Sequence, residues 1–177
     1  MAWRSDMGKE TGLSDRIQKQ WAMLSNKPGG KWLFSMAIGK MAPYSGTIGA
    51  LVDEMEPGYA KVLLKDRKKV RNHLRSVHAI ALINLGEITT GLATLSGMPG
   101  DARGILKGLS IDYHKKARGL LTAECRTEIP QSSERKVYEV EGKIYDGEGD
   151  CVATVTAQWL IGPAKAAAGT DENSPNE

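Results

Sequence analysis

The chain has 177 residues, of which 41% are hydrophobic and 25% charged, and its formal net charge is +3 at pH 7. This profile is that of one globular domain with a substantial core, and no uninterrupted apolar run reaches the roughly 20 residues that span a bilayer. The N-terminus lacks the apolar segment of a signal peptide. Cys125 and Cys151 have no metal-type spacing and lie in predicted strands, which favours buried reduced thiols over a disulfide. We therefore expect a cytoplasmic protein.

Two helices are predicted before residue 43. Ser14 is the expected N-cap of the first, and Pro28-Gly29-Gly30 ends it. Its apolar residues recur at helical spacing: Leu13, Ile17, Trp21 and Leu24. The second helix runs through Trp32 to Met41 and ends before Pro43.

Strands and one long helix are predicted for the rest of the chain. A hairpin joins Thr47–Met55 to Tyr59–Leu64 through Glu56-Pro57-Gly58. A helix follows from about Val77 to Leu95, and Gly97-Met98-Pro99-Gly100 closes it. Four further strands begin near residues 104, 121, 138 and 151, with apolar and polar residues alternating most clearly in the second.

This element order predicts an α+β fold, in which one long helix lies on one face of an antiparallel sheet. We expect a single domain at residues 13–162, with the N-terminal helices at 13–42 and the core at 43–162. Residues 1–12 and 163–177 are predicted to be flexible, because the tail has small and polar residues without an apolar period.

Three polar residues stand out around and inside the long apolar helix: Asn72, His78 and Glu87. A carboxylate such as Glu87 is costly to bury unless it has partners or a function. Glu87 lies nine residues after His78, which on one helix corresponds to about 13 Å along the axis. The two side chains cannot meet within one copy, so a site that they share must form between two chains.

With this order and spacing, the chain resembles proteins of the hotdog fold, in which a curved antiparallel sheet wraps one long helix. Among hotdog proteins it resembles the phenylacetate-pathway type of acyl-CoA thioesterase. Members carry an Asn, six residues later a His-Gly-Gly at the helix start, and an acidic residue nine after the His. Asn72, His78 and Glu87 match these positions. The resemblance covers about residues 43–161 and is closest to a poorly characterised branch that shares Arg71-Asn72-His73 and the run that begins at Val77.

The resemblance implies hydrolysis of acyl-CoA thioesters, with no metal and no bound redox cofactor. Glu87 would act as general base or as nucleophile, and the sequence does not separate these routes. The Ala79 amide at the helix start would stabilise the oxyanion, with Asn72 and His78 beside it, all from the partner chain of a homodimer or a dimer of dimers.

The chain departs from the pattern at two places. His-Gly-Gly is His78-Ala79-Ile80, and the Ser that holds the water in some members has its nearest position at Leu106, which leaves that role vacant or to Thr89 or Thr90. These departures favour an alternative function, a non-catalytic acyl-CoA-binding module, whereas the retained Asn72 and Glu87 argue against it. A hotdog dehydratase fits less well, because its Asp–His pair is not recognisable.

Each site residue also has a structural interpretation. Glu87 would be a buried carboxylate bonded to Thr90 or Asn84, Asn72 a turn cap, and His78 a core histidine. His73 and His114 have no supporting pattern and are assigned no role.

Basic residues gather before the long helix. Residues 61–75 hold seven basic side chains against Asp66, and a second cluster follows at 115–118. As phosphate partners for coenzyme A we expect Lys68, Lys69, Arg71, Arg75, Lys115, Lys116 and Arg118. The alternative is a solvated loop; a nucleic-acid site is disfavoured because no aromatic residues interleave with the basic ones.

The N-terminal helices have three interpretations. They limit the length of an acyl channel, they cover the sheet edge, or they contact a membrane through Trp21, Trp32 and Phe34. Packing on the protein is favoured over the membrane contact, so no membrane partner is expected.

Overall fold

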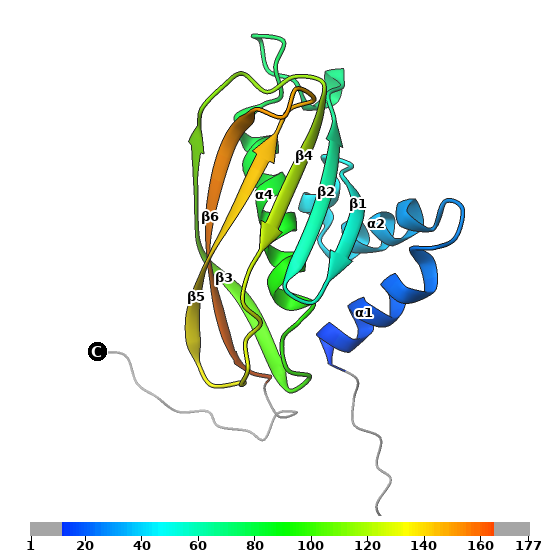
Figure 1. Cartoon of the computed structure of the whole chain (residues 1–177), viewed down its shortest axis with the longest axis vertical. Coiled ribbons are helices and arrows are strands. Elements are labelled where there is room, and N and C mark those ends of the chain that lie inside the picture. Colours follow the sequence, from blue (N-terminus) through cyan, green and yellow to red (C-terminus); the bar gives the residue numbers. More distant parts are fainter. Residues whose placement is uncertain (1–11, 165–177) are drawn as a thin grey trace, which may run out of the picture.

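The computed structural model describes residues 12–164, which form a six-stranded sheet wrapped around one long helix (Figure 1). The helices are α1 (Leu13–Leu24), α2 (Gly30–Met41), α3 (Pro43–Gly46) and α4 (Ala79–Leu95), with a short 3-10 turn at Lys68–Val70. The strands are β1 (Leu51–Glu56), β2 (Tyr59–Lys65), β3 (Ala102–Tyr113), β4 (Leu120–Arg126), β5 (Lys136–Tyr145) and β6 (Cys151–Pro163). The predicted flexible termini lie almost wholly outside the described residues.

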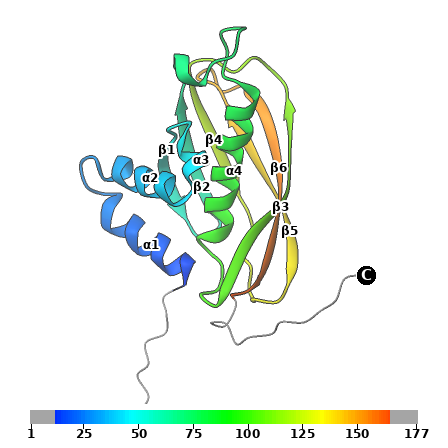
Figure 2. The same cartoon turned by 180° about the vertical axis from the view of Figure 1, so that it is seen from behind.

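The strands pair antiparallel throughout, in the order β1-β2-β4-β5-β6-β3. β1 and β3 are the two edges, and β3 pairs only with β6 within the described chain. α4 lies along the curved inner face of the sheet, and α1 and α2 lie on the β1 side (Figures 1 and 2). The predicted α+β arrangement is confirmed.

α4 packs closely on the sheet because small residues face it. A methyl group placed on Gly86 would lie 2.4 Å from a methyl of Val155 on β6, so a larger side chain would push helix and sheet apart. The buried threonines of α4 donate hydrogen bonds to carbonyls one turn earlier: Thr89 to Leu85 (2.7 Å), Thr90 to Gly86 (2.9 Å) and Thr94 to Thr90 (2.8 Å). These hydroxyls are therefore satisfied within their own helix.

The N-terminal helices pack on the domain. Trp21 and Phe34 meet edge to face with ring centroids 5.0 Å apart, and Phe34 is fully buried, so these two rings pack on each other within the domain, in line with the favoured interpretation rather than the membrane contact. α2 runs beside the edge strand β1, where the Ser35 hydroxyl accepts a hydrogen bond from the Val52 amide at 2.8 Å. The described residues contain no helix long and apolar enough to cross a membrane.

Three element boundaries differ from the prediction. Ser14 is not the N-cap of α1; Gly12 is, and the Ser14 hydroxyl instead donates to the Ser96 carbonyl at 2.7 Å, which joins α1 to the end of α4. β1 begins at Leu51 rather than residue 47, since Thr47 keeps helical dihedrals as the C-cap of α3 and Gly49 has a φ of +57° that strand backbone does not adopt. α4 begins two residues late because the Val77 amide donates to the Ala117 carbonyl at 2.9 Å.

Both cysteines are free in the structure. Cys125 is buried, which raises the pKa of its thiol to about 12, so it stays protonated at neutral pH. Cys151 is only partly buried, in contrast to the prediction that both thiols are buried.

Candidate functional site

Glu87 is a half-buried carboxylate in the middle of α4. Burial raises the pKa of its carboxyl group above the ordinary value. Among residues 12–164 its side chain has neither a hydrogen bond nor an ion pair, and the hydroxyl of Thr90 donates to backbone carbonyls. The amide of Asn84 donates to the Tyr44 carbonyl at 3.4 Å. A purely structural Glu87 was expected to bond to Thr90 or to Asn84, and neither bond is present.

The first turn of α4 keeps one backbone amide free. His78 is the N-cap, and its Nδ1 accepts from the Ile80 amide at 3.0 Å, while the Ala81 amide donates to the His78 carbonyl at 2.9 Å. The Ala79 N–H donates to no other described residue. His78 is exposed rather than a core residue. The positive end of the helix dipole and the Ala79 amide thus form a potential anion-binding point.

Asn72 organises the loop before α4. Its side-chain oxygen accepts hydrogen bonds from the Leu74 amide at 2.9 Å and from the Ser76 amide and hydroxyl, both at 3.2 Å. The turn-cap interpretation is therefore correct for this oxygen. The nitrogen of the Asn72 amide has no hydrogen bond within the described part of the chain and is left to act as a donor.

The candidate residues do not form one site in a single chain. Eight helical residues separate Ala79 from Glu87, which corresponds to about 12 Å along α4. Glu87 lies four residues after the partly buried Ile83 and seven after the exposed Ile80, spacings that place all three on one face of α4, and this face is left incompletely covered. The acid and the free amide can meet only if a second chain brings its own α4.

The two basic clusters lie at the same end of the molecule, although about forty residues separate them (Figure 1). The backbones of Asp66 and Gly119 are joined by a hydrogen bond of 3.0 Å from the Asp66 amide. Arg71 is engaged in this junction: its Nε donates to Asp66 at 2.6 Å, and this bond lowers the pKa of the Asp66 carboxyl.

Most of the other basic candidates are unengaged. Lys115 donates to three carboxylates, and these hydrogen bonds, the one to Asp150 first, raise the pKa of its ammonium group. The basic candidates that are exposed and have no ion pair to a described residue are Lys68, Lys69, Arg75, Lys116 and Arg118.

One acidic group in residues 12–164 has a metal-like arrangement, namely Asp146, Glu148 and Asp150 in the turn between β5 and β6. The Lys115 ammonium lies 2.5–3.2 Å from all three and supplies the positive charge that the group needs. The Lys115 ammonium thus accounts for the arrangement of these three carboxylates without a metal ion.

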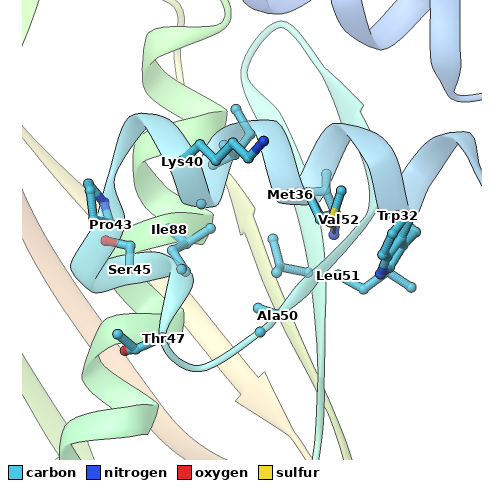
Figure 3. A pocket seen from close by; sticks show the side chains of 16 residues that line it. Trp32, Met36, Lys40, Pro43, Ser45, Thr47, Ala50, Leu51, Val52 and Ile88 are labelled. Atoms are coloured by element: carbon cyan, nitrogen blue, oxygen red, sulfur yellow. Dashed lines mark hydrogen bonds between the residues drawn. The ribbon is translucent and has the colours of Figure 1, made fainter.

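Two pockets accompany the site; an acyl channel limited by the N-terminal helices was one interpretation of the sequence, but the residues that line the pockets were not predicted. The larger, about 620 Å³, lies between α2, α3 and β1 and contains none of the predicted catalytic residues, although Ile88 beside Glu87 lines it (Figure 3). The smaller, about 210 Å³, lies at the start of α4 and is lined by His78, Arg71 and Asn84 among others. Asn84 is 3% exposed, and its Oδ1 has no hydrogen-bond partner within residues 12–164. An Asn inside an apolar helical run was the only sequence signal for it.

Comparison with solved structures identifies the fold. The genomics target APC5556 superposes with a TM-score of 0.72 at 30% sequence identity, over 84% of this chain and 98% of that chain. A Pseudomonas aeruginosa protein of unknown function, described as a probable thioesterase, matches with a TM-score of 0.65 at 21% identity, over 71% and 91%. A phenylacetic acid degradation-related protein from Ralstonia eutropha matches with a TM-score of 0.57 at 21% identity, over 67% and 89%.

The resemblance to hotdog-fold proteins of the thioesterase type is thus confirmed for the fold. No curated protein matches the sequence. A family model does match, over residues 30–161, which include α2, α3, α4 and the sheet except for the last two residues of β6. The chain therefore belongs to the family of the domain of unknown function DUF4442 and has the hotdog fold.

Proposed function

We propose that this protein hydrolyses acyl-CoA thioesters. The observation that carries the proposal is Glu87: a half-buried carboxylate with a raised pKa and no partner among the described residues, on the face of α4 that is incompletely covered. A structural carboxylate at such a depth normally has hydrogen-bond partners, and a general base profits from a pKa nearer to neutral. The thioesterases that share the fold supply the reaction class.

The reaction would use two chains. The Glu87 carboxylate of one chain would take a proton from water, or attack the thioester carbonyl itself, and the Ala79 amide of the partner would donate to the developing oxyanion. Asn72 would offer its free amide nitrogen to the carbonyl or the water. His78 would hold the first turn of α4 in place through its bond to Ile80.

A second copy has an available docking edge. β3 is a twelve-residue edge strand whose second side is unpaired within the described chain, and it lies at the edge of the sheet away from α1 and α2 (Figure 2). Such an edge is a ready template for pairing with another chain. We propose a homodimer or a dimer of dimers in the cytoplasm, where both thiols would stay reduced.

The exposed basic residues Lys68, Lys69, Arg75, Lys116 and Arg118 would attract the phosphates of coenzyme A, because both clusters lie at the end of the molecule where α4 begins. Arg71 and Lys115 already form ion pairs with carboxylates, so they would contribute by keeping the two basic loops in place rather than by binding phosphate.

The test is hydrolysis of a panel of acyl-CoAs from short to long chains, with phenylacetyl-CoA included, followed by release of the thiol. Turnover that needs Glu87 would support the proposal. Saturable binding of acyl-CoA without turnover would instead favour the non-catalytic binding module, which the methyl and sec-butyl groups of Ala79 and Ile80 at the oxyanion position also suit.

A mixing experiment tests whether the site is shared. Glu87→Gln and Asn72→Ala would each be inactive alone, but subunits mixed in equal amounts would form heterodimers with one intact site. The expected recovery is about one quarter of wild-type activity, since half of the dimers carry one working site of two. No recovery, with subunit exchange verified, would rule out a shared site.

A further inference from the structure

The larger pocket has a built apolar wall. It has a volume of about 620 Å³, within the range of about 300–1,000 Å³ usual for small-molecule sites. Side chains from α2, the segment after α3, β1 and α4 converge on it (Figure 3). Its apolar surface comes chiefly from Trp32, Met36, Ala50, Leu51, Val52 and Ile88.

Two of the three hydroxyl groups in the wall, those of Ser35 and Thr47, make hydrogen bonds with the backbone. The Ser35 hydroxyl donates to the Lys31 carbonyl at 2.7 Å and accepts from the Val52 amide, and the Thr47 hydroxyl donates to the Tyr44 carbonyl at 2.5 Å. The Ser35 and Thr47 hydroxyls therefore have no need of a polar ligand, which leaves Ser45 as the one hydroxyl in the wall without a hydrogen bond to a described residue. A polar molecule would lose its hydration in this pocket with few bonds in return, whereas an apolar chain would lose nothing.

One charged residue lines the pocket. Lys40, near the end of α2, is exposed and has no ion pair among residues 12–164, in contrast to Lys31 on the same helix, which pairs with Asp53 at 2.7 Å. The mouth is also apolar, because Trp32 is 58% and Met36 39% exposed. The pocket therefore combines a long apolar surface with a single cation, which suits a molecule with an aliphatic chain and one anionic end.

We propose that this pocket binds an aliphatic acyl chain with an anionic end, with the chain against α2 and β1 and the anionic end near Lys40. Two sources share this chemistry: a free fatty acid, and the acyl part of a thioester substrate. Binding of the chain stands apart from the proposed hydrolysis; only its assignment to a substrate rests on that function.

The first experiment is titration of the whole protein with straight-chain fatty acids from hexanoate to palmitate, by calorimetry. Affinity should rise about fourfold for each added methylene until the pocket is full and then level off. Ala50→Phe places a ring in the pocket and should abolish binding of the longer acids. The matched control is Ala37→Phe, an exposed position on α2 that does not line the pocket. Ser45→Phe is a second pocket-filling variant if Ala50→Phe fails to fold.

The charge is tested separately. Lys40→Met should weaken the binding of laurate by no more than about fivefold, as expected for an exposed ion pair, and leave the binding of dodecanol unchanged. Loss of both ligands would mean that Lys40 acts through packing and would overturn the placement of the anionic end.

Hydrolysis distinguishes the two sources. If the chain belongs to the substrate, Ala50→Phe shifts the preferred acyl-CoA to shorter chains, whereas Ala37→Phe does not. If free fatty acids bind and the chain-length preference stays unchanged in Ala50→Phe, the pocket serves a separate fatty-acid ligand. If the wild type hydrolyses no thioester, the proposed hydrolysis is refuted, but the fatty-acid titration still tests whether the pocket binds an acyl chain. Absence of saturable fatty-acid binding, or equal binding by Ala50→Phe, would overturn the proposal.

Discussion

Replacing Glu87 with Gln separates a catalytic carboxylate from a structural one. The substitution keeps the shape of the side chain and removes its charge. If Glu87 is the general base, hydrolysis should fall by about 10²–10⁴-fold, which corresponds to about 3–5 kcal/mol in the barrier.

The effect on stability has the opposite sign. Burial raises the folded pKa of Glu87 above its unfolded value, so ionisation of this group costs folding free energy as the pH rises through that interval. Glu87→Gln removes this cost, and no hydrogen bond within residues 12–164 is lost with the charge. We expect the variant to be at least as stable as the wild type at neutral pH. The difference should vanish in acid, below the ordinary pKa of Glu, where both side chains are neutral.

The assay is steady-state hydrolysis across the pH range, with urea unfolding of the same samples. The wild-type kcat/KM should rise with pH through the raised pKa of Glu87, because the ionised form is the active one. The control is Glu139→Gln, an exposed glutamate of β5, which should change neither quantity. A variant that keeps wild-type hydrolysis, or that loses stability at neutral pH by the 0.5–1.5 kcal/mol or so of a lost hydrogen bond, would refute the catalytic role.

Three further predictions concern the loops and the packing of α4. Arg75→Glu should raise the KM for acyl-CoA by up to about fivefold, more at low ionic strength than at high, whereas Arg135→Glu in the loop before β5 should not; a KM independent of salt would exclude a phosphate contact. His78→Ala should lower the free energy of unfolding by about 0.5–2 kcal/mol because the helix loses its cap, and it should lower hydrolysis as the first turn of α4 loosens. His78→Asn, which can also cap the helix, should restore both stability and hydrolysis. Hydrolysis that stays low in His78→Asn would instead indicate proton transfer by the imidazole. Gly86→Ala should destabilise by about 1–3 kcal/mol in urea unfolding because its methyl would meet β6, whereas Gly147→Ala, with open space around it, should lie within about 0.5 kcal/mol of wild type.

The sequence by itself determined the order and type of most elements. Alternation in β4 and β6 and the apolar run of α4 are local patterns that follow from the two side-chain periods, 2 and 3.6, so they can be read without knowing what packs on them. The candidate acid and the helix start were also readable, because a carboxylate in an apolar helix and a polar residue before it are unusual in the sequence alone.

Tertiary structure decided the rest, because it depends on contacts between residues far apart in the chain. Ser14 satisfies a carbonyl 82 residues away rather than its own helix, and Asp66 joins the two basic loops and takes up the charge of Arg71. The pocket between α2 and β1 and the unpaired oxygen of Asn84 likewise follow from packing. Local sequence preferences do not specify such long-range partners. Only the folded chain therefore determines which basic residues remain without an ion pair and where an apolar ligand fits.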